Sequence, residues 1–384
     1  MRSPRRVLPR GSGSAALRVL LLSAPVGEGH VAAARALAAR MRTLWPHAEV
    51  SEVETVAGGP RRTALLTGAY QVVMRWAPGL YGVAYDVLGR LPRVAVLFQR
   101  LGAPATARSL RPVLRAHAPD LVVCTYPVTT GGLALLRRRG ELTARTVAVV
   151  TDPAVHPFWI WPDVDETWTM LDSAAADARR LGARDVRVVP PAVGPRFGPS
   201  GAGRKASLLP RGDSFDAFLP RGGITVLVTG GSLGFGSLEA VTDAVLTAGA
   251  RAVVLAGRND DLHRRLTARH DLRLRVLGWT DRVPEEMAAA DLVLTTGGGM
   301  IAAEALAVGR PVLFATPVPG HGRAAARALA DAGLAVACPT ADDVARAVAA
   351  LAADPRRRDE LARAARAFSA RDLDAELTAL AARC

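Results

Sequence analysis

The sequence of 384 residues has few cysteines, few aromatic residues and a single lysine, Lys205. Its three cysteines, Cys124, Cys338 and Cys384, are too scattered for a disulfide framework or a metal cluster, so we expect a reducing, cytoplasmic compartment. Its apolar runs fall far short of the roughly 20 residues that span a bilayer, so we expect no transmembrane helix. The run 19–26 is also too short for a secretory signal and is predicted to be a buried strand.

Half of the residues are apolar, so a large core is expected and disorder is excluded for most of the chain. Domains contain roughly 100–200 residues, so the length predicts two domains. Positive charge is concentrated in the first half. Residues 1–200 hold 26 arginines against 14 acidic residues, a net charge of +12, which leaves +2 of the total of +14 for residues 201–384.

A basic protein face attracts anionic surfaces such as nucleic acid or acidic lipids. The sequence has no recognisable RNA- or DNA-binding motif, so we expect an anionic membrane rather than nucleic acid as the partner. The alternative is a solvated basic surface, together with a flexible basic tail over residues 1–16.

Short β-rich apolar runs alternate with helical stretches rich in alanine, leucine and arginine, and this alternation predicts parallel sheets. Residues 196–223 are rich in proline and glycine and are predicted to be a linker. We therefore expect an α/β protein with two doubly wound domains that face each other across a cleft, over residues 17–195 and 224–384. The second domain is expected to end in helices. The expected strands lie near 18–24, 48–54, 120–125, 146–151, 166–170, 186–189, 224–229, 251–256, 272–277, 291–295, 311–315 and 334–337.

Residues 62–101 interrupt this alternation. They contain no convincing strand, but they contain aromatic residues, Trp76 and Tyr81 among them, with arginines scattered between apolar residues. The segment is predicted to be a helical insertion in the first domain that faces a membrane.

In open α/β sheets, ligands bind beyond the carboxyl ends of the strands, so the loops that follow strands matter most. The first such loop contains Gly27, Gly29 and His30. Its spacing of glycines allows a dinucleotide site, as in a dehydrogenase, or a tight turn that presents His30 for catalysis. Asp152 and His156 follow a later strand and are further catalytic candidates.

Two glycine-rich loops stand in the second half, over residues 230–236 and 297–301. Glycines allow backbone N–H groups to approach a phosphate, and the helix that follows favours the anion. Glu304 lies just after the second loop, where a carboxylate could accept two ribose hydroxyls or could be a solvated acid at a helix start. Asp163 and Asp165 have the spacing of a metal-binding pair, but we expect a solvated turn.

Together these loops resemble glycosyltransferase family 28, in particular its branch of monogalactosyldiacylglycerol synthases and processive diacylglycerol glucosyltransferases. The resemblance covers roughly residues 17–350. It is carried by LLLSAPVGEGHVAAARAL, YQVVMRWAPGLYGVAYD, VVTDPAVHPFWIWPDVDETWTM, VLAGRNDDL and VLGWTDRVPEEMAAADLVLTTGGG, whereas the GGS triplet at 230–232 is similar to the related enzyme that makes lipid II.

The resemblance implies a GT-B fold, with a lipid acceptor in the first domain and a UDP-sugar in the second. It implies an inverting reaction that needs no bound metal or other cofactor, with His30 as the base. Trp279 would mark the uracil site and Glu304 the ribose site. Gly27, Gly29, Trp76, Tyr81 and Trp159 would lie on the acceptor or membrane side. The other donor-binding positions that it implies are Gly231, Ser232, Gly234, Gly298, Gly299, Met300, Ile301, His321 and Arg323.

Two departures from the family pattern affect the donor site. The Gln or Glu-Gln pair that reads the sugar is replaced near His321 and Gly322, and a basic residue of the second glycine-rich loop is replaced by Thr296. Arg323 is expected to compensate for the second loss.

We therefore expect an inverting transferase that moves a hexose from a UDP-sugar to a lipid hydroxyl, with diacylglycerol as the favoured acceptor. It would work in the cytoplasm, peripherally attached to the inner face of the cell membrane. The alternatives are a soluble transferase that acts on a small aglycone, an NAD-dependent dehydrogenase, and a non-catalytic protein that binds nucleotide-sugars or lipids. Neither the sugar nor the oligomeric state follows from the sequence.

Overall fold

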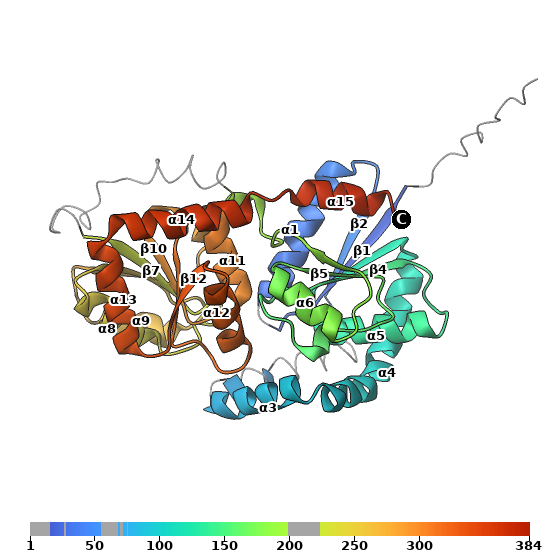
Figure 1. Ribbon diagram of the computed structural model, residues 1–384, viewed down its shortest axis with the longest axis horizontal. Helices are drawn as coiled ribbons and strands as arrows, with labels where there is room; N and C mark the ends of the chain where they lie inside the picture. The colour runs from blue at the N-terminus through green and yellow to red at the C-terminus, as the bar shows by residue number, and fades with distance from the viewer. Residues whose placement is uncertain (1–15, 27, 55–67, 70–71, 75, 199–222) are drawn as a thin grey trace, which may run out of the picture.

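The computed structural model shows two α/β domains side by side (Figure 1). It describes residues 16–26, 28–54, 68–69, 72–74, 76–198 and 223–384. The expected fold class is confirmed, because each domain is built around a parallel sheet of six strands.

The first sheet contains strands from residues 18 to 188, all paired in parallel. In sheet order they are β2 (Glu49–Glu54), β1 (Arg18–Ser23), β3 (Leu121–Cys124), β4 (Arg145–Val149), β5 (Glu166–Thr169) and β6 (Val186–Val188). Successive residues of β1 face opposite sides, so Leu21 packs under α1 and α15 whereas Leu20 packs under α4 and α5. Both faces of the sheet are therefore covered, which explains why its central strands are continuous apolar runs.

The second sheet repeats this arrangement from residue 225 to residue 338. In sheet order its strands are β12 (Ala335–Cys338), β11 (Val312–Ala315), β10 (Leu292–Thr295), β7 (Thr225–Thr229), β8 (Arg251–Leu255) and β9 (Leu274–Leu277). All twelve expected strands are present, with ends within two residues of the expected ones.

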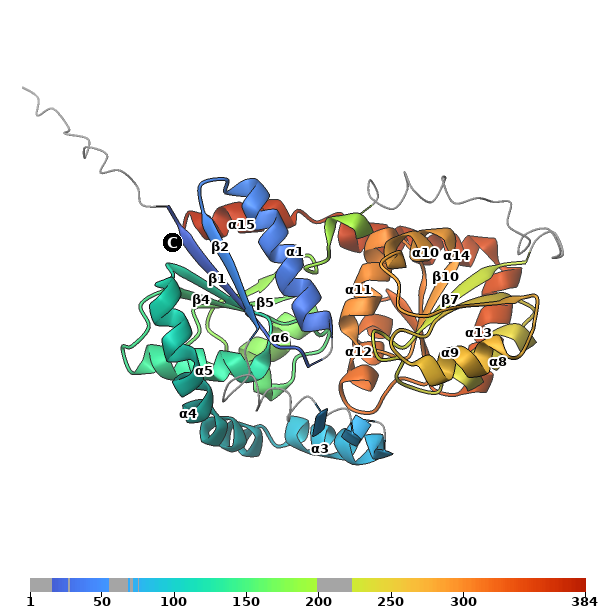
Figure 2. The same ribbon diagram turned by 180° about the vertical axis from the view of Figure 1, so that it is seen from behind.

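Helices connect the strands and cover both sheets (Figures 1 and 2). In the first half they are α1 (Glu28–Leu44), α3 (Pro78–Arg90), α4 (Pro92–His117), α5 (Pro127–Arg138) and α6 (Asp172–Arg180). In the second half they are α8 (Leu238–Thr247), α9 (Asp260–Thr267), α10 (Val283–Ala289), α11 (Gly299–Val308), α12 (His321–Asp331), α13 (Ala341–Ala353), α14 (Pro355–Ser369) and α15 (Leu373–Ala381).

The last helix crosses back to the first domain (Figure 1). Leu373, Leu377 and Leu380 of α15 are buried against α1 in the core of that domain. The second domain was predicted to extend to residue 384. This prediction is wrong for α15, because the apolar face of that helix packs against α1 of the first domain.

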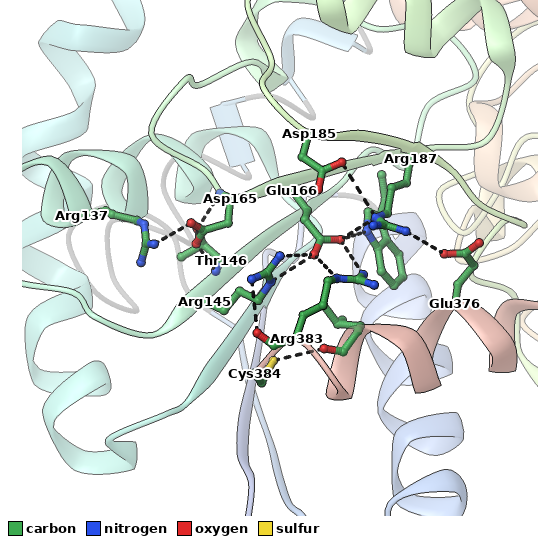
Figure 3. Close-up of polar contacts among 12 residues, drawn as sticks. Arg137, Arg145, Thr146, Asp165, Glu166, Asp185, Arg187, Glu376, Arg383 and Cys384 are labelled. Atoms are coloured by element: carbon green, nitrogen blue, oxygen red, sulfur yellow. Dashed lines mark hydrogen bonds and ion pairs between the residues drawn. The ribbon is translucent and has the colours of Figure 1, made fainter.

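A buried carboxylate anchors this crossing helix (Figure 3). Glu166 has no exposed surface and accepts hydrogen bonds from Arg145 and Arg383, while Arg187 lies 3.2 Å away. Burial raises the pKa of Glu166, but the hydrogen bonds from Arg383, Trp168 and Arg145 outweigh it and hold that pKa at about 2. Arg383 follows α15, so the end of the chain is tied to the first sheet by charge as well as by apolar packing.

The predicted helical insertion includes α3 and the start of α4 within the described residues, and residues 62–67 lie outside them. In both views α3 runs along one side of the molecule, across the junction between the domains (Figures 1 and 2). Gly82 of α3 lies so close to the second domain that a Cβ there would meet Pro319 at 2.3 Å. The insertion therefore contacts both domains.

Candidate functional site

A cavity of about 490 Å³ lies where the two domains meet. Its walls come from the loops at the carboxyl ends of strands in both sheets, which is where open α/β sheets bind ligands. The structure brings many of the predicted site residues together in these walls, namely Gly29, His30, Tyr81, Asp152, His156, Trp159, Gly231, Ser232, Gly298, Gly299, Met300, Ile301, Glu304 and His321.

His30 lies in the first turn of α1, directly beyond β1. Its Nδ1 is 3.0 Å from the hydroxyl of Thr151, and its ring meets the edges of Tyr126 and Trp159. Burial lowers the pKa of His30, whereas the negative charge of Asp152 raises it. A neutral imidazole held at Nδ1 can keep Nε2 free to accept a proton, which is the geometry that a general base requires.

Gly29 packs close to the second domain. A Cβ at Gly29 would lie 3.3 Å from the side chain of Met300 in α11, and Gly299 approaches Pro153 even more closely. The first glycine-rich loop thus serves the contact between domains and presents His30. This packing between the domains favours the tight turn that presents His30 over the dinucleotide site of a dehydrogenase. Gly27 lies outside the described residues.

His156 has both ring nitrogens engaged. Its Nδ1 accepts from the backbone N–H of Phe158 at 3.3 Å, and its Nε2 lies 3.2 Å from the backbone oxygen of Tyr85. The ring is buried and packs 4.3 Å from the ring of Tyr85. This arrangement holds α3 against the first domain, whereas Asp152 reaches the cavity wall nearby. The geometry therefore favours a positioning role for His156 and leaves Asp152 as the second candidate base.

The donor-side wall is made of the two glycine-rich loops. Gly231 and Gly234 have positive φ angles of 75° and 59°, and a Cβ on Gly234 would meet the backbone of Ala256 at 2.6 Å. The hydroxyl of Thr296 bonds to the backbone oxygen of Phe235 and so ties the two loops together. The positive φ angles and this close approach require glycine.

Glu304 is largely enclosed within the cavity wall, one turn into α11. Burial raises the pKa of its carboxyl group to about 8. Among the described contacts no hydrogen bond or ion pair satisfies this carboxylate, which distinguishes it from Glu166. An enclosed, unsatisfied carboxyl group on a cavity wall is typical of a binding residue.

His321 begins α12, and its Nδ1 lies 3.2 Å from the hydroxyl of Tyr81. Tyr81 was predicted to face a membrane, but its hydroxyl points into the cavity from α3. Trp159 also lines the cavity and is only 2% exposed, so it lies on the acceptor side without reaching the surface.

Four predicted residues among those described lie outside the cavity wall, and one of them is Gly234 of the first glycine-rich loop. Arg323 pairs with Asp86 of α3 at 3.1 Å, so it is not the free cation expected to replace the one missing at Thr296. Trp76 is exposed on the outer surface. Trp279 lies at the rim, with the guanidinium of Arg258 3.8 Å above its ring.

Sequence reasoning missed several residues that the structure places at the site. Tyr126 and Thr151 flank His30, and both follow strands, which was the one signal available for them. Arg258 pairs with Glu28 at 2.8 Å and thereby joins the two domains at the rim. Such a pair between residues far apart in the chain has no local signature.

Asp163 and Asp165 form structural ion pairs. Asp163 bonds to Arg138, and Asp165 bonds to Arg137 and to the backbone N–H of Thr146. These contacts support the expected turn rather than a metal-binding pair.

Comparisons with known proteins match both halves of the chain. Residues 30–191 match the sequence model of monogalactosyldiacylglycerol (MGDG) synthase, and residues 225–377 match that of the glycosyltransferase family 28 C-terminal domain. A processive diacylglycerol beta-glucosyltransferase of Bacillus subtilis is 25% identical over 348 residues, which cover 88% of this chain and 87% of that protein.

Solved structures share the fold. MurG of Acinetobacter baumannii superposes with a TM-score of 0.58 at 14% identity, over 95% of this chain and 99% of that one. HepE of Anabaena, in complex with UDP and glucose, superposes with a TM-score of 0.53 at 16% identity, over 96% of this chain and 98% of that one. These likenesses confirm a GT-B architecture.

Proposed function

Because the chain belongs to glycosyltransferase family 28 and is a UDP-sugar-dependent transferase, we propose that it moves a hexose to the hydroxyl of diacylglycerol, with inversion at the anomeric carbon. The single observation that carries the proposal is the composition of one cavity. His30 of the first domain and the glycine-rich loops and Glu304 of the second line the same space.

The acceptor side supplies the base. In the proposed reaction Nε2 of His30 takes the proton of the acceptor hydroxyl as its oxygen attacks the anomeric carbon. Thr151 holds Nδ1, and the rings of Tyr126 and Trp159 fix the plane of the imidazole. Attack on the face opposite the departing UDP inverts the configuration in a single displacement.

The donor side stabilises the charge that develops on UDP. The diphosphate would lie beside the start of α11, whose first N–H groups have no side-chain cap, and oriented dipoles in an enclosed site stabilise such charge strongly. Glu304 would accept hydrogen bonds from the ribose hydroxyls. In this proposal the protein groups supply the stabilisation without a bound metal or other cofactor, so transfer should survive removal of divalent cations by a chelator.

The outer surface of α3 and α4 suits a membrane. Ten of the thirteen exposed large apolar side chains among the described residues lie between 72 and 101. We call them the apolar stripe: Val72, Trp76, Leu80, Val83, Val87, Leu91, Val94, Leu97, Phe98 and Leu101. Their spacing of three and four residues places them along one side of the helices.

Arg90, Arg93 and Arg100 are exposed beside this stripe, and the first half of the chain is strongly basic. Apolar insertion and attraction to anionic lipid together hold a protein on a membrane more firmly than either alone. Among the described residues, none of the helices has the length and apolar character needed to cross a bilayer. We therefore propose peripheral attachment to an anionic, cytoplasmic membrane face, which would bring the cavity to its water-insoluble acceptor.

A panel of donors tests the proposal. Purified protein is incubated with UDP-glucose, UDP-galactose, UDP-N-acetylglucosamine or UDP-glucuronate, on vesicles with and without diacylglycerol, and the lipids are analysed by mass spectrometry. We expect a glycosylated diacylglycerol with at least one donor. Transfer to a small water-soluble alcohol but not to diacylglycerol would favour the aglycone alternative, and UDP binding without any product would favour a binding protein.

A further inference from the structure

The orientation of His321 is set across the domain boundary. His321 belongs to the second domain, whereas Tyr81, whose hydroxyl lies 3.2 Å from Nδ1, belongs to α3. The two rings meet edge to face with centroids 5.8 Å apart. Gly320 makes this approach possible, because a Cβ there would lie 3.0 Å from both Tyr81 and Tyr85.

The opposite edge of the His321 ring faces the start of α11. A Cβ on Gly298, the N-cap residue of that helix, would lie 3.5 Å from Cδ2 and 3.7 Å from Nε2 of His321. No side chain caps the first N–H groups of α11. Those groups and Nε2 therefore border the same part of the cavity, where the proposed function places the donor's diphosphate.

An anion at this position determines which nitrogen of His321 carries the proton. In the protein without a ligand, burial lowers the pKa of His321 and the charge of Asp152 raises it to a smaller extent, which favours the neutral ring. A neutral imidazole has one donor and one acceptor nitrogen. Beside an anion Nε2 must be the donor, so Nδ1 must accept, and the Tyr81 hydroxyl lies at the distance needed to donate to it.

We propose that Nε2 of His321 donates a hydrogen bond to the donor's diphosphate and stabilises the departing UDP, and that Tyr81 is the positioning residue that fixes this tautomer. The inference rests on the proposed function. In the transfer step the bond between the anomeric carbon and the β-phosphate oxygen breaks, and its electron pair stays with UDP. The acceptor oxygen forms the new bond, its proton passes to His30, and His321 gives up no proton.

With this assignment, His321 supplies a hydrogen-bond donor for the diphosphate, in place of the basic residue that is replaced by Thr296. The Thr296 hydroxyl is engaged by Phe235, and Arg323 is engaged by Asp86, so neither is placed to contact the diphosphate. It also gives α3 a part in the donor site, because this helix bears part of the apolar stripe on one face and contributes Tyr81 from another.

Calorimetric titration with UDP and with UMP tests the contact, because UMP lacks the β-phosphate. We expect His321→Ala to bind UDP about tenfold to a hundredfold more weakly, as for a lost hydrogen bond to a charged group, and to bind UMP unchanged. His321→Gln, which keeps an N–H group near the position of Nε2, should recover most of the affinity. Tyr81→Phe should weaken UDP binding a few-fold and leave UMP binding unchanged. Exposed His47→Ala is the matched control.

Nitrogen-15 NMR of the imidazole groups gives a second readout. The chain has seven histidines, and comparison with His321→Gln identifies the signals of His321. With UDP bound, we expect the Nε2–H tautomer in the wild type and a mixture in Tyr81→Phe.

A wild type with the Nδ1–H tautomer in the UDP complex would overturn the inference. Unchanged UDP affinity in His321→Ala, or an equal loss of UDP and UMP affinity, would do the same. An altered preference among UDP-hexoses with unchanged UDP affinity would place the ring on the sugar instead. If the wild type binds neither UDP nor UMP, the proposed function itself fails, so the two failures are distinguishable.

Discussion

At the scale of single residues, His30 is the side chain on which turnover depends most. We predict that His30→Ala lowers kcat by about 10²–10⁴-fold, as removal of a general base does, with little change in UDP affinity. Burial lowers the pKa of His30, so kcat/KM of the wild type should decline on the acid side only below about pH 6.5, the ordinary value. Steady-state kinetics measures both effects.

Near-full turnover in His30→Ala would move the base to Asp152, the other predicted catalytic residue in the cavity wall, because both ring nitrogens of His156 are engaged by backbone groups. The kcat of Asp152→Asn, measured in the same assay, separates the two candidates, because only loss of the base should lower it strongly.

Glu304 is predicted to bind the nucleoside. Glu304→Ala should weaken UDP binding, with each lost hydrogen bond from a ribose hydroxyl to the charged group worth about 1.5–3 kcal/mol. Calorimetry with UDP and with 2′,3′-dideoxy-UDP checks the assignment. The variant should lose affinity for UDP only, and equal affinities of variant and wild type for UDP would remove Glu304 from the site.

Glu304 should also lower the stability of the folded protein at neutral and alkaline pH. Burial raises the pKa of Glu304 to about 8 in the folded protein, against about 4.3 in an unfolded chain. Between these values the unfolded chain releases the proton and the folded protein retains it, so stability falls as the pH rises from about 4.3 towards 8. Glu304→Gln stays neutral, so its Tm in the absence of UDP should exceed that of the wild type at pH 8 and match it near pH 4. A Tm difference independent of pH would contradict this account.

At the scale of elements, α3 combines two roles on two of its faces. Tyr81, Ala84, Tyr85 and Leu88 line the cavity, whereas the apolar stripe runs along the exposed side. We predict that Leu80→Ser with Val83→Ser weakens co-sedimentation with anionic vesicles. Binding of the wild type should rise with the fraction of anionic lipid and fall with salt, because each basic residue near such a surface contributes about 1 kcal/mol and is screened.

Leu272→Ser, an equally exposed leucine of the second domain, is the control and should bind like the wild type. If the wild type does not co-sediment with anionic vesicles at low salt, the proposal of membrane attachment fails.

The strands could be predicted closely because buried parallel strands are short apolar runs bounded by turn residues. Helix α4 was harder. It begins at Pro92, and Pro104 and Pro112 lie within it and obscure its periodicity. The cavity residues that follow strands could also be predicted.

Three pairs between the domains could not be predicted from the sequence, because their contacts have no local pattern. They are Tyr81–His321, Asp86–Arg323 and Glu28–Arg258.

At the scale of the whole molecule, Glu166 ties the end of the chain to the first domain (Figure 3). We predict that Glu166→Gln destabilises this domain by about 1.5–3 kcal/mol, because it removes the charged acceptor that the partly exposed guanidinium groups of Arg145 and Arg383 share. The pKa of Glu166 is lowered in the folded protein, so this contribution is present above about pH 4.3 and is lost as the pH falls towards 2. Hydrogen exchange in α15 and the Tm measure it.

The exposed pair Asp177–Arg180 provides the control, since Asp177→Asn should cost at most about 1 kcal/mol. Equal rates of amide hydrogen exchange in α15 of the wild type and of Glu166→Gln would show that apolar packing alone holds this helix on the first domain.

The central claim is that one cavity joins a nucleotide-sugar site to a lipid acceptor site. Its most direct measurement is the amount of UDP released and of hexose transferred to lipid in the same sample, on diacylglycerol vesicles, for wild type and His30→Ala. We predict equal amounts of both products in the wild type, an anomeric configuration opposite to that of the donor, and loss of both products in the variant. Release of UDP with free hexose and no glycolipid, or retention of the donor's configuration, would contradict the account.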